Sequence, residues 1–563
     1  MKLGLQNVRN LDDAFRSYES LCRMRPLPSP KQFTQLLSNV VKLKEYSAAI
    51  YIFKDMSCNL GVLVNEYTMN VAINSYCLSN RVDYGFSILG WFFKRGCVPD
   101  TFTFTALLKG LFKENKINEA QGLFRKMVKE GLCELDVVTY GTVIDGLCKA
   151  GNTPMAIEML RVMEKRRSCK PNTHIYSMII DSLCKDRMVD SALKLFDEMS
   201  DKGIPPDVAT YNALICGLCN LSRWNEAKLL IKKMIDYKIN PDVVTFSILI
   251  DALCKEGLVD EAKEVLDIMK QRNVNPDVFT YSSLMDGYCL LGRMNEARGV
   301  FDLMVSKNVA PNIWSYSILL NGYCKKTKID DAMRIFREMP RKGMKPDVTT
   351  YNTILQGLFR GGRVSDALEI FDELQAVGLK PTFYTYSNML DGLCKNGQVE
   401  RATSLLDALE RKEGKCLDIT YYNIVIDGLC EAKNLDAARA VFRDLDAKGV
   451  TPVVRTYNIM IKGCLQNGRP EEAKDLLVEM EQSSLLPNEF TYNLVVQGFL
   501  MRGEYDAAAK FLEEMVAKGF SPSSTVLALM LDSLDTKEHG SSILKFIKKW
   551  APSTLNSENG SKN

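Results

Sequence analysis

The chain has 563 residues, of which 46% are apolar, and its 72 basic side chains nearly balance 69 acidic ones. This composition allows a large buried core, while a net charge of +3 gives no overall positive field that would indicate a nucleic-acid partner. No apolar run approaches the roughly 20 residues that span a bilayer, so no membrane insertion is expected. A nucleic-acid partner would need a local basic stripe.

The N-terminal residues do not resemble a targeting segment. They contain arginines but also Asp12, Asp13 and Glu19, whereas organelle transit peptides are poor in acidic residues. From Leu11 the letters LDDAF resemble the second half of a repeat that recurs downstream. We therefore expect residues 1–29 to form a half-repeat that caps the array, with a targeting segment absent or atypical in this chain.

A stretch of about 35 residues recurs along the rest of the chain. The segment GIPPDVATYNALICGLC, from Gly203 to Cys219, returns with small changes as VNPDVFTYSSLMDGYC and LLPNEFTYNLVVQGFL. With position 1 set just after the recurring Pro-Asp, consecutive repeats start 35 or 36 residues apart. The starts are Pro30, Glu66, Thr101, Val137, Thr173, Val208, Val243, Val278, Ile313, Val348, Phe383, Ile419, Val454 and Glu489. This period predicts fourteen repeats over residues 30–523, a decayed capping repeat over 524–550 and a disordered polar tail over 551–563.

Each repeat is predicted to contain two amphipathic helices. Tyr211, Leu214, Ile215 and Leu218 lie at i, i+3, i+4 and i+7, and the second helix keeps a small residue such as Ala192 at one phase. Glycine and proline follow each second helix and end it. Because one hairpin cannot bury both faces, neighbours must stack. The predicted fold is all-α: an α-solenoid superhelix of tandem 35-residue helix-turn-helix repeats.

Nine of the seventeen cysteines recur at a single phase of the repeat. Each follows an apolar or aromatic residue in a helical pattern, which predicts small buried core residues in a reducing compartment rather than disulfides. These cysteines are Cys77, Cys148, Cys184, Cys219, Cys254, Cys289, Cys324, Cys394 and Cys430.

We find no catalytic or metal-binding constellation in the sequence, and a core role is expected for the one C-x-x-C pair ahead of a redox or zinc pair. The chain's only histidines, His174 and His539, lie outside any H-x-E element, and the only C-x-x-C pair, Cys216 and Cys219, includes a recurring core cysteine. No phosphate-binding glycine loop is present. We expect no enzyme activity, no cofactor, no metal and no small-molecule substrate.

Two positions of the repeat hold a polar residue in almost every copy, and we call each such set of equivalent residues a column. Position 5 is almost always Asn, Ser or Thr, which are poor residues for a helix interior and cannot be caps there. The last residue of the repeat is also polar, and here capping of the following helix is an alternative explanation. Paired by repeat, the two columns are Thr34 with Asn65, Asn70 with Asp100, Thr105 with Asp136, Gly141 with Asn172, Ser177 with Asp207, Asn212 with Asp242, Ser247 with Asp277, Ser282 with Asn312, Ser317 with Asp347, Asn352 with Thr382, Ser387 with Asp418, Asn423 with Val453, Asn458 with Asn488 and Asn493 with Ser523.

Over nearly the whole chain, the repeat resembles that of the pentatricopeptide repeat family. The resemblance rests on the 35-residue period, the VTYN-like openings, G-L-C-K, a central E-A or D-A and a terminal P-D. A tetratricopeptide array has a 34-residue period and a W-x-x-L-G-x-x-Y pattern, which is absent here. The uniform repeats look like P-class proteins of plant organelles, and the opening segment is similar to restorer-of-fertility-like members.

This resemblance implies binding of single-stranded RNA, with about one base per repeat read by the position-5 and last residues. In the family, Ser or Thr at position 5 goes with purines and Asn with pyrimidines. A terminal Asp accepts from the ring N–H of guanine or uracil, whereas Asn or Ser can donate to adenine or cytosine. The implied target is A-U-G-A-G-U-G-A-G-Y-G-Y-Y-C, where Y is a pyrimidine. The off-pattern pair Gly141 with Asn172 implies A at best, and Asn423 with Val453 implies only a weak pyrimidine preference.

Two further columns suit a nucleic-acid groove. Position 2 lies on the same side as position 5, and in the family it sandwiches the base; ordinary surface packing is the alternative. Position 13 supplies lysines that could follow phosphates or simply favour the helix C-terminus. The position-2 residues include Tyr67, Phe102, Val138, His174, Val244, Phe279, Trp314, Tyr384 and Phe490. The lysines are Lys42, Lys113, Lys149, Lys185, Lys255, Lys325 and Lys395, with Arg360 as a variant.

The pattern leads to one principal hypothesis and one alternative. The principal one is a non-catalytic, sequence-specific RNA-binding protein acting on an organelle transcript in processing, stabilisation or translation, with the mitochondrion expected ahead of the chloroplast. Its partners would be single-stranded RNA and protein processing factors, and a fertility restorer is the sharper family-level expectation. The alternative is a protein-interaction scaffold of the α-solenoid type. A scaffold has no reason to restrict position 5 to small polar residues.

Overall fold

A computed structural model describes residues 10–58, 60, 62, 64–166, 169–413 and 417–534. These residues contain thirty α-helices and no strand, which confirms the all-α prediction. Contacts divide the chain into two units, residues 1–284 and 285–563, whose boundary falls inside helix α16 (Val278–Leu290). Each unit is described by itself.

The first unit contains α1 to α15 and the start of α16. After α1, each even-numbered helix is the first helix of a repeat and each odd-numbered helix is the second. The bounds are α1 (Leu11–Arg23), α2 (Pro30–Lys42), α3 (Tyr46–Cys58), α4 (Glu66–Leu78), α5 (Val82–Lys94), α6 (Thr101–Lys113), α7 (Ile117–Glu130), α8 (Val137–Lys149), α9 (Thr153–Glu164), α10 (Thr173–Lys185), α11 (Val189–Asp201), α12 (Val208–Asn220), α13 (Trp224–Asp236), α14 (Val243–Lys255) and α15 (Val259–Gln271).

The second unit continues the same alternation after the rest of α16. Its helices are α17 (Met294–Ser306), α18 (Ile313–Lys325), α19 (Ile329–Arg341), α20 (Val348–Arg360), α21 (Val364–Ala376), α22 (Phe383–Lys395), α23 (Val399–Glu413), α24 (Ile419–Glu431), α25 (Leu435–Ala447), α26 (Val454–Gln466), α27 (Pro470–Gln482), α28 (Glu489–Met501), α29 (Tyr505–Ala517) and α30 (Ser524–Leu534).

Every predicted repeat start is the first residue of an observed helix, from Pro30 to Glu489, and α30 likewise begins at Ser524. The cause is local capping chemistry. The Asp207 carboxylate accepts from the Thr210 backbone N–H at 2.9 Å, and the Thr210 hydroxyl accepts in return from the Asp207 N–H at 3.3 Å. The preceding helix α11 ends at a turn in which Gly203 has a φ of 72°, a left-handed conformation that glycine adopts without strain.

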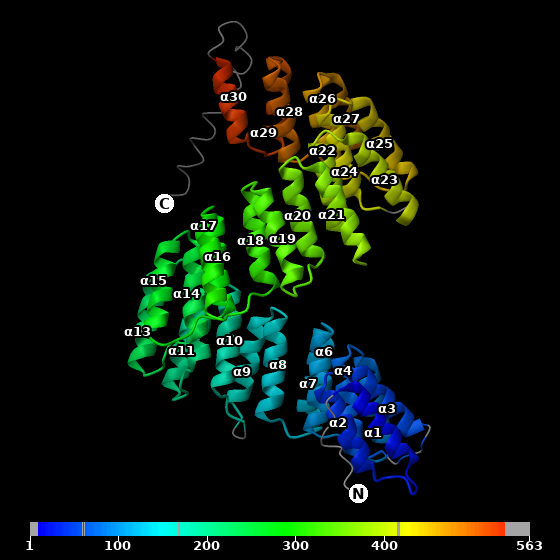
Figure 1. Cartoon of the computed structure of the whole chain (residues 1–563), viewed down its shortest axis with the longest axis vertical. Coiled ribbons are helices and arrows are strands. Elements are labelled where there is room, and N and C mark those ends of the chain that lie inside the picture. The colour runs from blue at the N-terminus through cyan, green and yellow to red at the C-terminus, as the bar shows by residue number, and fades with distance from the viewer. Residues whose placement is uncertain are drawn as a thin grey trace. The chain divides into compact units, whose positions relative to one another are not determined.

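Within each unit the first helices pack against one another in chain order. In the first unit α4, α6, α8, α10, α12 and α14 form such a row, and in the second α18, α20, α22, α24, α26, α28 and α30 do so. A second helix packs against its own first helix and, in most repeats, also against the first helix of the next repeat, as α5 does with α4 and α6. Successive hairpins are visible side by side within each unit (Figure 1). Within each unit the first helices therefore form one layer and the second helices another.

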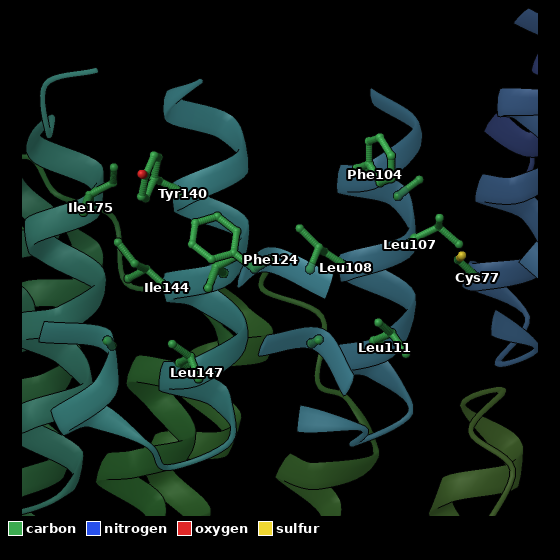
Figure 2. Close-up of a cluster of buried hydrophobic side chains, with 14 of the residues drawn as sticks. Cys77, Phe104, Leu107, Leu108, Leu111, Phe124, Tyr140, Ile144, Leu147 and Ile175 are labelled. Carbon is green, nitrogen blue, oxygen red and sulfur yellow. The ribbon is translucent and has the colours of Figure 1, made fainter. Parts of the chain in front are cut away.

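The core lies between the two layers of helices. Figure 2 shows Phe124 of α7 beside Tyr140 of α8, with Ile144 and Leu147 of α8 following along the same helix. The rings of Phe124 and Tyr140 meet edge to face with centroids 5.4 Å apart. Five more pairs of a second-helix Phe and the next position-4 Tyr repeat this geometry at 5.1–5.9 Å. Such pairs each contribute about 0.5–1.5 kcal/mol beyond burial, so the interface is stabilised repeat by repeat.

The recurring cysteines pack against small residues of the next first helix. Cys324 of α18 faces Gly357 of α20, where an added Cβ would lie 2.3 Å from the cysteine Sγ. Burial raises the pKa of the Cys324 thiol to about 12, which makes it unreactive at neutral pH. Seven of the nine cysteines of this column are buried, while Cys148 and Cys394 are half-buried.

A cluster of charged side chains joins two second helices of the first unit. Arg161 of α9 contacts Glu198 of α11, and Lys202 lies 2.7 Å from Glu164, which also accepts from the Tyr176 hydroxyl at 2.6 Å. The hydrogen bond from Arg161 lowers the pKa of Glu198 to about 2. This carboxylate therefore belongs to a network rather than to an isolated surface pair.

Replacing Glu198 with glutamine is expected to destabilise the protein by about 1 kcal/mol at neutral pH, a modest value because the pair is partly solvated. The folded-state pKa lies below the ordinary value of 4.5, so the ionised carboxylate stabilises the fold above about pH 4.5 and this contribution is lost as the pH falls towards about 2. Thermal melting of both proteins at pH 7 and at about pH 3.5 tests this. An unchanged difference at the two pH values would contradict it.

The predicted capping repeat is described only in its first helix, α30. The remainder of that repeat, with His539, and the predicted tail lie outside the described residues. None of the helices in the described part of the chain is long and apolar enough to cross a membrane.

Candidate nucleic-acid interface

The two polar columns meet in space, because the last residue of each repeat caps the first helix of the next. Asn212 lies in the first turns of α12, and Asp242 caps α14. The amide Nδ2 of Asn212 donates to Asp242 Oδ1 at 3.2 Å, and Asn70 donates to Asp100 in the same way at 3.3 Å. Side chains thirty residues apart in the sequence thus form one polar pair. Asn212 is buried and Asp242 is exposed.

A threonine at position 3 of the following repeat joins many of these pairs. Thr245 Oγ1 lies 2.6 Å from Asn212 Oδ1 and 2.9 Å from Asp242 Oδ1. Thr103 makes the same two contacts with Asn70 and Asp100, at 2.6 and 2.7 Å. The position-3 threonines are almost completely buried, at 0 or 1% exposed. The sequence pattern predicts a helix opening at these threonines but not this bridge.

Pairs with Ser or Thr at position 5 use the same threonine. Ser177 Oγ lies 2.6 Å from Thr210 Oγ1, and Thr210 is 2.8 Å from Asp207 Oδ1. Ser247 is joined to Asp277 through Thr280, Thr34 to Asn65 through Thr68, and Thr105 to Asp136 through Thr139. In the second unit Thr491 joins Asn458 to Asn488 at 2.9 and 3.0 Å.

The carboxylate of the Asn212–Asp242 pair is held ionised. Burial by itself would raise its pKa, but hydrogen bonds from the Thr245 backbone, the Asn212 amide and the Thr245 hydroxyl outweigh that effect and lower the pKa of Asp242. The pair therefore presents a charged acceptor at neutral pH. An acceptor of this kind matches a ring N–H donor.

Some predicted pairs are not joined in this way. Gly141 has no side chain, and position 3 of the next repeat is the buried Ile175, so Asn172 serves only as the cap of α10. Asp418 accepts from the Thr420 N–H at 2.8 Å, and Tyr421 occupies position 3, so Ser387 Oγ makes no hydrogen bond within the described residues.

Most of the remaining predicted pairs make other contacts, or none within the described residues. The oxygens Asn352 Oδ1 and Asn423 Oδ1 also make no hydrogen bond within the described residues, while Thr382 caps α22 and Val453 precedes α26. Ser317 donates to the Ile313 carbonyl and Asp347 caps α20. Asn493 Oδ1 accepts from the Ser523 N–H at 2.7 Å. Ser282 is buried in the first unit, and Asn312 caps α18 in the second.

The last-residue column does act as helix caps, as the alternative explanation held. Its polar members accept hydrogen bonds from the first turn of the next helix, and most of them are exposed, so capping leaves them accessible. Capping and base contact are therefore compatible at one side chain.

The position-2 residues surround hollows beside these pairs. All nine named above are exposed, from 44% for Trp314 to 72% for Tyr384, with His174 also exposed. A hollow of about 750 Å³ is lined by His174 and Val244 together with Ser177, Asn212 and Asp242. Smaller hollows lie at Gly141 with Asn172, at Asn352 with Thr382 and at Asn458 with Asn488, with volumes of about 510, 640 and 550 Å³. Exposed aromatic faces beside polar pairs suit stacked, hydrogen-bonded bases.

Four of the seven position-13 lysines are partly neutralised by an aspartate one turn earlier. Lys149 pairs with Asp145 at 2.7 Å, and the ammonium groups of Lys185, Lys255 and Lys395 pair with Asp181, Asp251 and Asp391 at 2.6–2.8 Å. The Lys113 ammonium instead donates to the Leu78 carbonyl. A phosphate at these lysines must compete with a carboxylate. The recurring i, i+4 spacing of Asp and Lys in D-G-L-C-K could have revealed this pairing.

No group of three His, Cys, Asp or Glu side chains is placed to hold a metal ion in the ranges that the structure covers. Cys219 is buried, and Cys216 lines the largest of the hollows described above, where the Asn220 amide lies 3.6 Å from its Sγ. The C-x-x-C spacing therefore places one cysteine in the core and one beside the pairs.

The fold and the repeated pairs define an α-solenoid repeat protein. The PPR repeat family model matches overlapping stretches over residues 135–395 and 417–534, and PPR repeat models match residues 95–128 and 384–413. The chain belongs to the pentatricopeptide repeat family.

Relatives and solved structures agree with this assignment. The chain is 38% identical over 120 residues to the Arabidopsis thaliana pentatricopeptide repeat-containing protein At1g12700, and 39% identical over 96 residues to At3g22470; both are named mitochondrial. These matches cover 21% and 17% of this chain, and only 20% and 15% of the two relatives' own lengths.

The structure is also similar to a crystal structure of the pentatricopeptide repeat protein PPR10 in complex with an 18-nt psaJ RNA element. The TM-score is 0.54 at 23% identity, with 97% of this chain and 83% of that chain covered. PPR10 from maize gives a TM-score of 0.51 at 22% identity, covering 97% and 88%. At 22–23% sequence identity, this similarity to PPR10 establishes the fold alone.

Proposed function

We propose that this protein binds single-stranded RNA in a sequence-specific manner, with about one base per repeat and without catalysis. The observation that carries the proposal is the recurring pair of a position-5 amide or hydroxyl and an exposed cap, each beside an exposed position-2 face. Alternating stacking faces and donor or acceptor groups at repeat spacing match successive bases of a single strand. The RNA complex of the fold neighbour PPR10 supports the same proposal.

The proposed setting is an organelle transcript, with the mitochondrion first because relatives are named mitochondrial. By occupying a defined segment, the protein would block exonucleases, remodel RNA structure or guide processing and translation through other factors. Restoration of fertility, by action on an aberrant mitochondrial transcript, is the sharper form of this proposal.

Selection of RNA ligands from a random pool with the purified protein tests the proposal. We expect enriched sequences related to A-U-G-A-G-U-G-A-G-Y-G-Y-Y-C in one register. Enrichment without any common sequence would contradict sequence-specific binding, and a failure to bind RNA at all would favour the protein scaffold.

Replacing Phe490 with alanine is expected to weaken RNA binding about tenfold, because stacking of one base contributes roughly 1–3 kcal/mol. Phe490 is 65% exposed beside Asn458 and Asn488, so its loss should barely change the melting temperature. Binding of the 14-mer by fluorescence anisotropy measures the effect. Val478→Ala, an exposed apolar residue on the second helix α27, is the matched control and should leave affinity unchanged. Equal effects of the two variants would contradict a stacking role.

A further inference from the structure

The threonine at position 3 makes contacts beyond those that cap the first helix of its own repeat. We propose that it positions the base-reading pair of the preceding repeat, so that the specificity at one base depends on a buried residue of the next repeat. This inference rests on the proposed function, because it concerns the same pairs.

The hydroxyl of Thr245 has one proton and several neighbours. It accepts from the Asp242 backbone N–H at 3.2 Å, and two acceptors, Asn212 Oδ1 and Asp242 Oδ1, lie at 2.6 and 2.9 Å. Asp242 Oδ1 already accepts from the Thr245 N–H at 2.9 Å and from the Asn212 amide. The single proton therefore goes to the nearer acceptor, Asn212 Oδ1.

This donation fixes which way the Asn212 amide points. Its oxygen is held inward by Thr245, and its nitrogen is held against Asp242 Oδ1. The hydrogen bonds from Asn212 and Thr245 to the Asp242 carboxylate all use Oδ1, so they leave the accepting capacity of Oδ2 untouched. A base at this repeat thus meets a fixed amide donor and a fixed carboxylate acceptor. Preorganised groups of this kind discriminate better than mobile ones.

The same arrangement occurs independently at other repeats. Thr103 Oγ1 lies 2.6 Å from Asn70 Oδ1 and 2.7 Å from Asp100 Oδ1, and the Asn70 amide donates to Asp100 at 3.3 Å, so the pair is fixed in the same way. In a serine pair, Ser177 Oγ donates to the Thr173 carbonyl at 2.9 Å, so the proton between Ser177 and Thr210 at 2.6 Å comes from the threonine. The threonine is the donor in both kinds of pair.

Where position 3 lacks this hydroxyl, the pair is not held. Tyr421 stands at position 3 after the Ser387–Asp418 pair, and Ser387 Oγ makes no hydrogen bond within the described residues. Asp418 has φ −63° and ψ 136°, whereas Asp242 has φ −101° and ψ −176°. We therefore expect weak discrimination at the base of this repeat, although its residue types imply guanine.

Capping alone is the competing explanation, and the chain contains a control for it. The Thr456 hydroxyl accepts from the Val453 backbone N–H at 3.2 Å, as the Thr245 hydroxyl does from Asp242, but the last residue of that repeat is valine, whose side chain accepts nothing, and Asn423 Oδ1 makes no hydrogen bond within the described residues. Thr456→Val therefore removes a cap without removing a contact to a polar pair. Thr245→Val removes both.

The experiment compares full-length wild type, Thr245→Val, Thr245→Ser and Thr456→Val on the 14-mer carrying each of the four bases at position 6. We expect Thr245→Val to reduce the preference for U over C and A at base 6 about fivefold, the effect of one lost hydrogen bond. Preference at base 7, read by Ser247 and Asp277, should be unchanged. Thr245→Ser should restore the base-6 preference. Thr456→Val should lower the melting temperature but leave the base-6 preference unchanged.

Two results would overturn the inference in different ways. If Thr245→Val keeps the wild-type preference while its melting temperature falls as in Thr456→Val, the threonine is only a cap. If the wild type itself is indifferent to base 6, the proposed function fails and the positioning role fails with it. Should Thr245→Val not fold, Thr103→Val measured at base 2 gives the same test at the Asn70–Asp100 pair.

Discussion

Replacing Asn212 with serine is expected to shift the preferred base at repeat 6 from U to G while all other bases keep their preferences. Serine is smaller than asparagine, so it leaves room for the larger purine beside the same Asp242 acceptor. The resulting Ser–Thr–Asp arrangement already exists one repeat earlier at Ser177 and one repeat later at Ser247. The ratio of affinities for U and G should change by about 2 kcal/mol, roughly 30-fold.

The reciprocal variant Ser247→Asn is the matched control, and it should move base 7 from G towards U. Competition binding with 14-mers that differ only at base 6 or base 7 measures both shifts. Retention of wild-type preference by both variants would show that position 5 does not contact the base.

Replacing Gly357 with alanine is expected to destabilise the protein by about 2 kcal/mol, within the range for overpacked cores. The new Cβ would lie 2.3 Å from Cys324 Sγ and 2.8 Å from Cys324 Cβ. Because these atoms are held close to the α18 backbone, the two first helices must move apart. Thermal or urea unfolding measures the loss.

Gly299→Ala in α17 is the control for the same chemical change. Apart from the adjoining backbone of α17, no atom lies within 4 Å of the added Cβ there, so helix propensity dominates and the variant should be more stable by about 0.5–1 kcal/mol. A destabilising effect at Gly299 equal to that at Gly357 would contradict the packing explanation.

Much of the fold follows from the sequence because each repeat carries its own start signal. A polar residue before the repeat caps the helix, glycine and proline end the second helix, and the apolar phases between them set the buried faces. Asp207 and Gly203 illustrate the two ends of one such hairpin junction. The observed helix starts coincide with the predicted repeat starts for this local reason.

The site is less predictable because its pairs depend on contacts between repeats. Position 5 and the cap can be named from the period, but the bridge by Thr245 needs the packing of α12 on α14. The different backbone conformation of Asp418 could not be predicted from the sequence either, because Ser387 and Asp418 are the residue types expected at these two positions. The ion pairs that neutralise Lys149 and its equivalents could have been predicted from the sequence, because Asp145 lies four residues before Lys149 on the same helix.

The most direct test of base recognition by successive repeats is competition between the 14-mer A-U-G-A-G-U-G-A-G-Y-G-Y-Y-C and its complement for the full-length protein in a gel-shift assay. If successive repeats read successive bases, the 14-mer should outcompete its complement by at least about 1000-fold, because even a few mismatched bases at roughly 1–3 kcal/mol each exceed 4 kcal/mol. Equal competition by the two RNAs would contradict it.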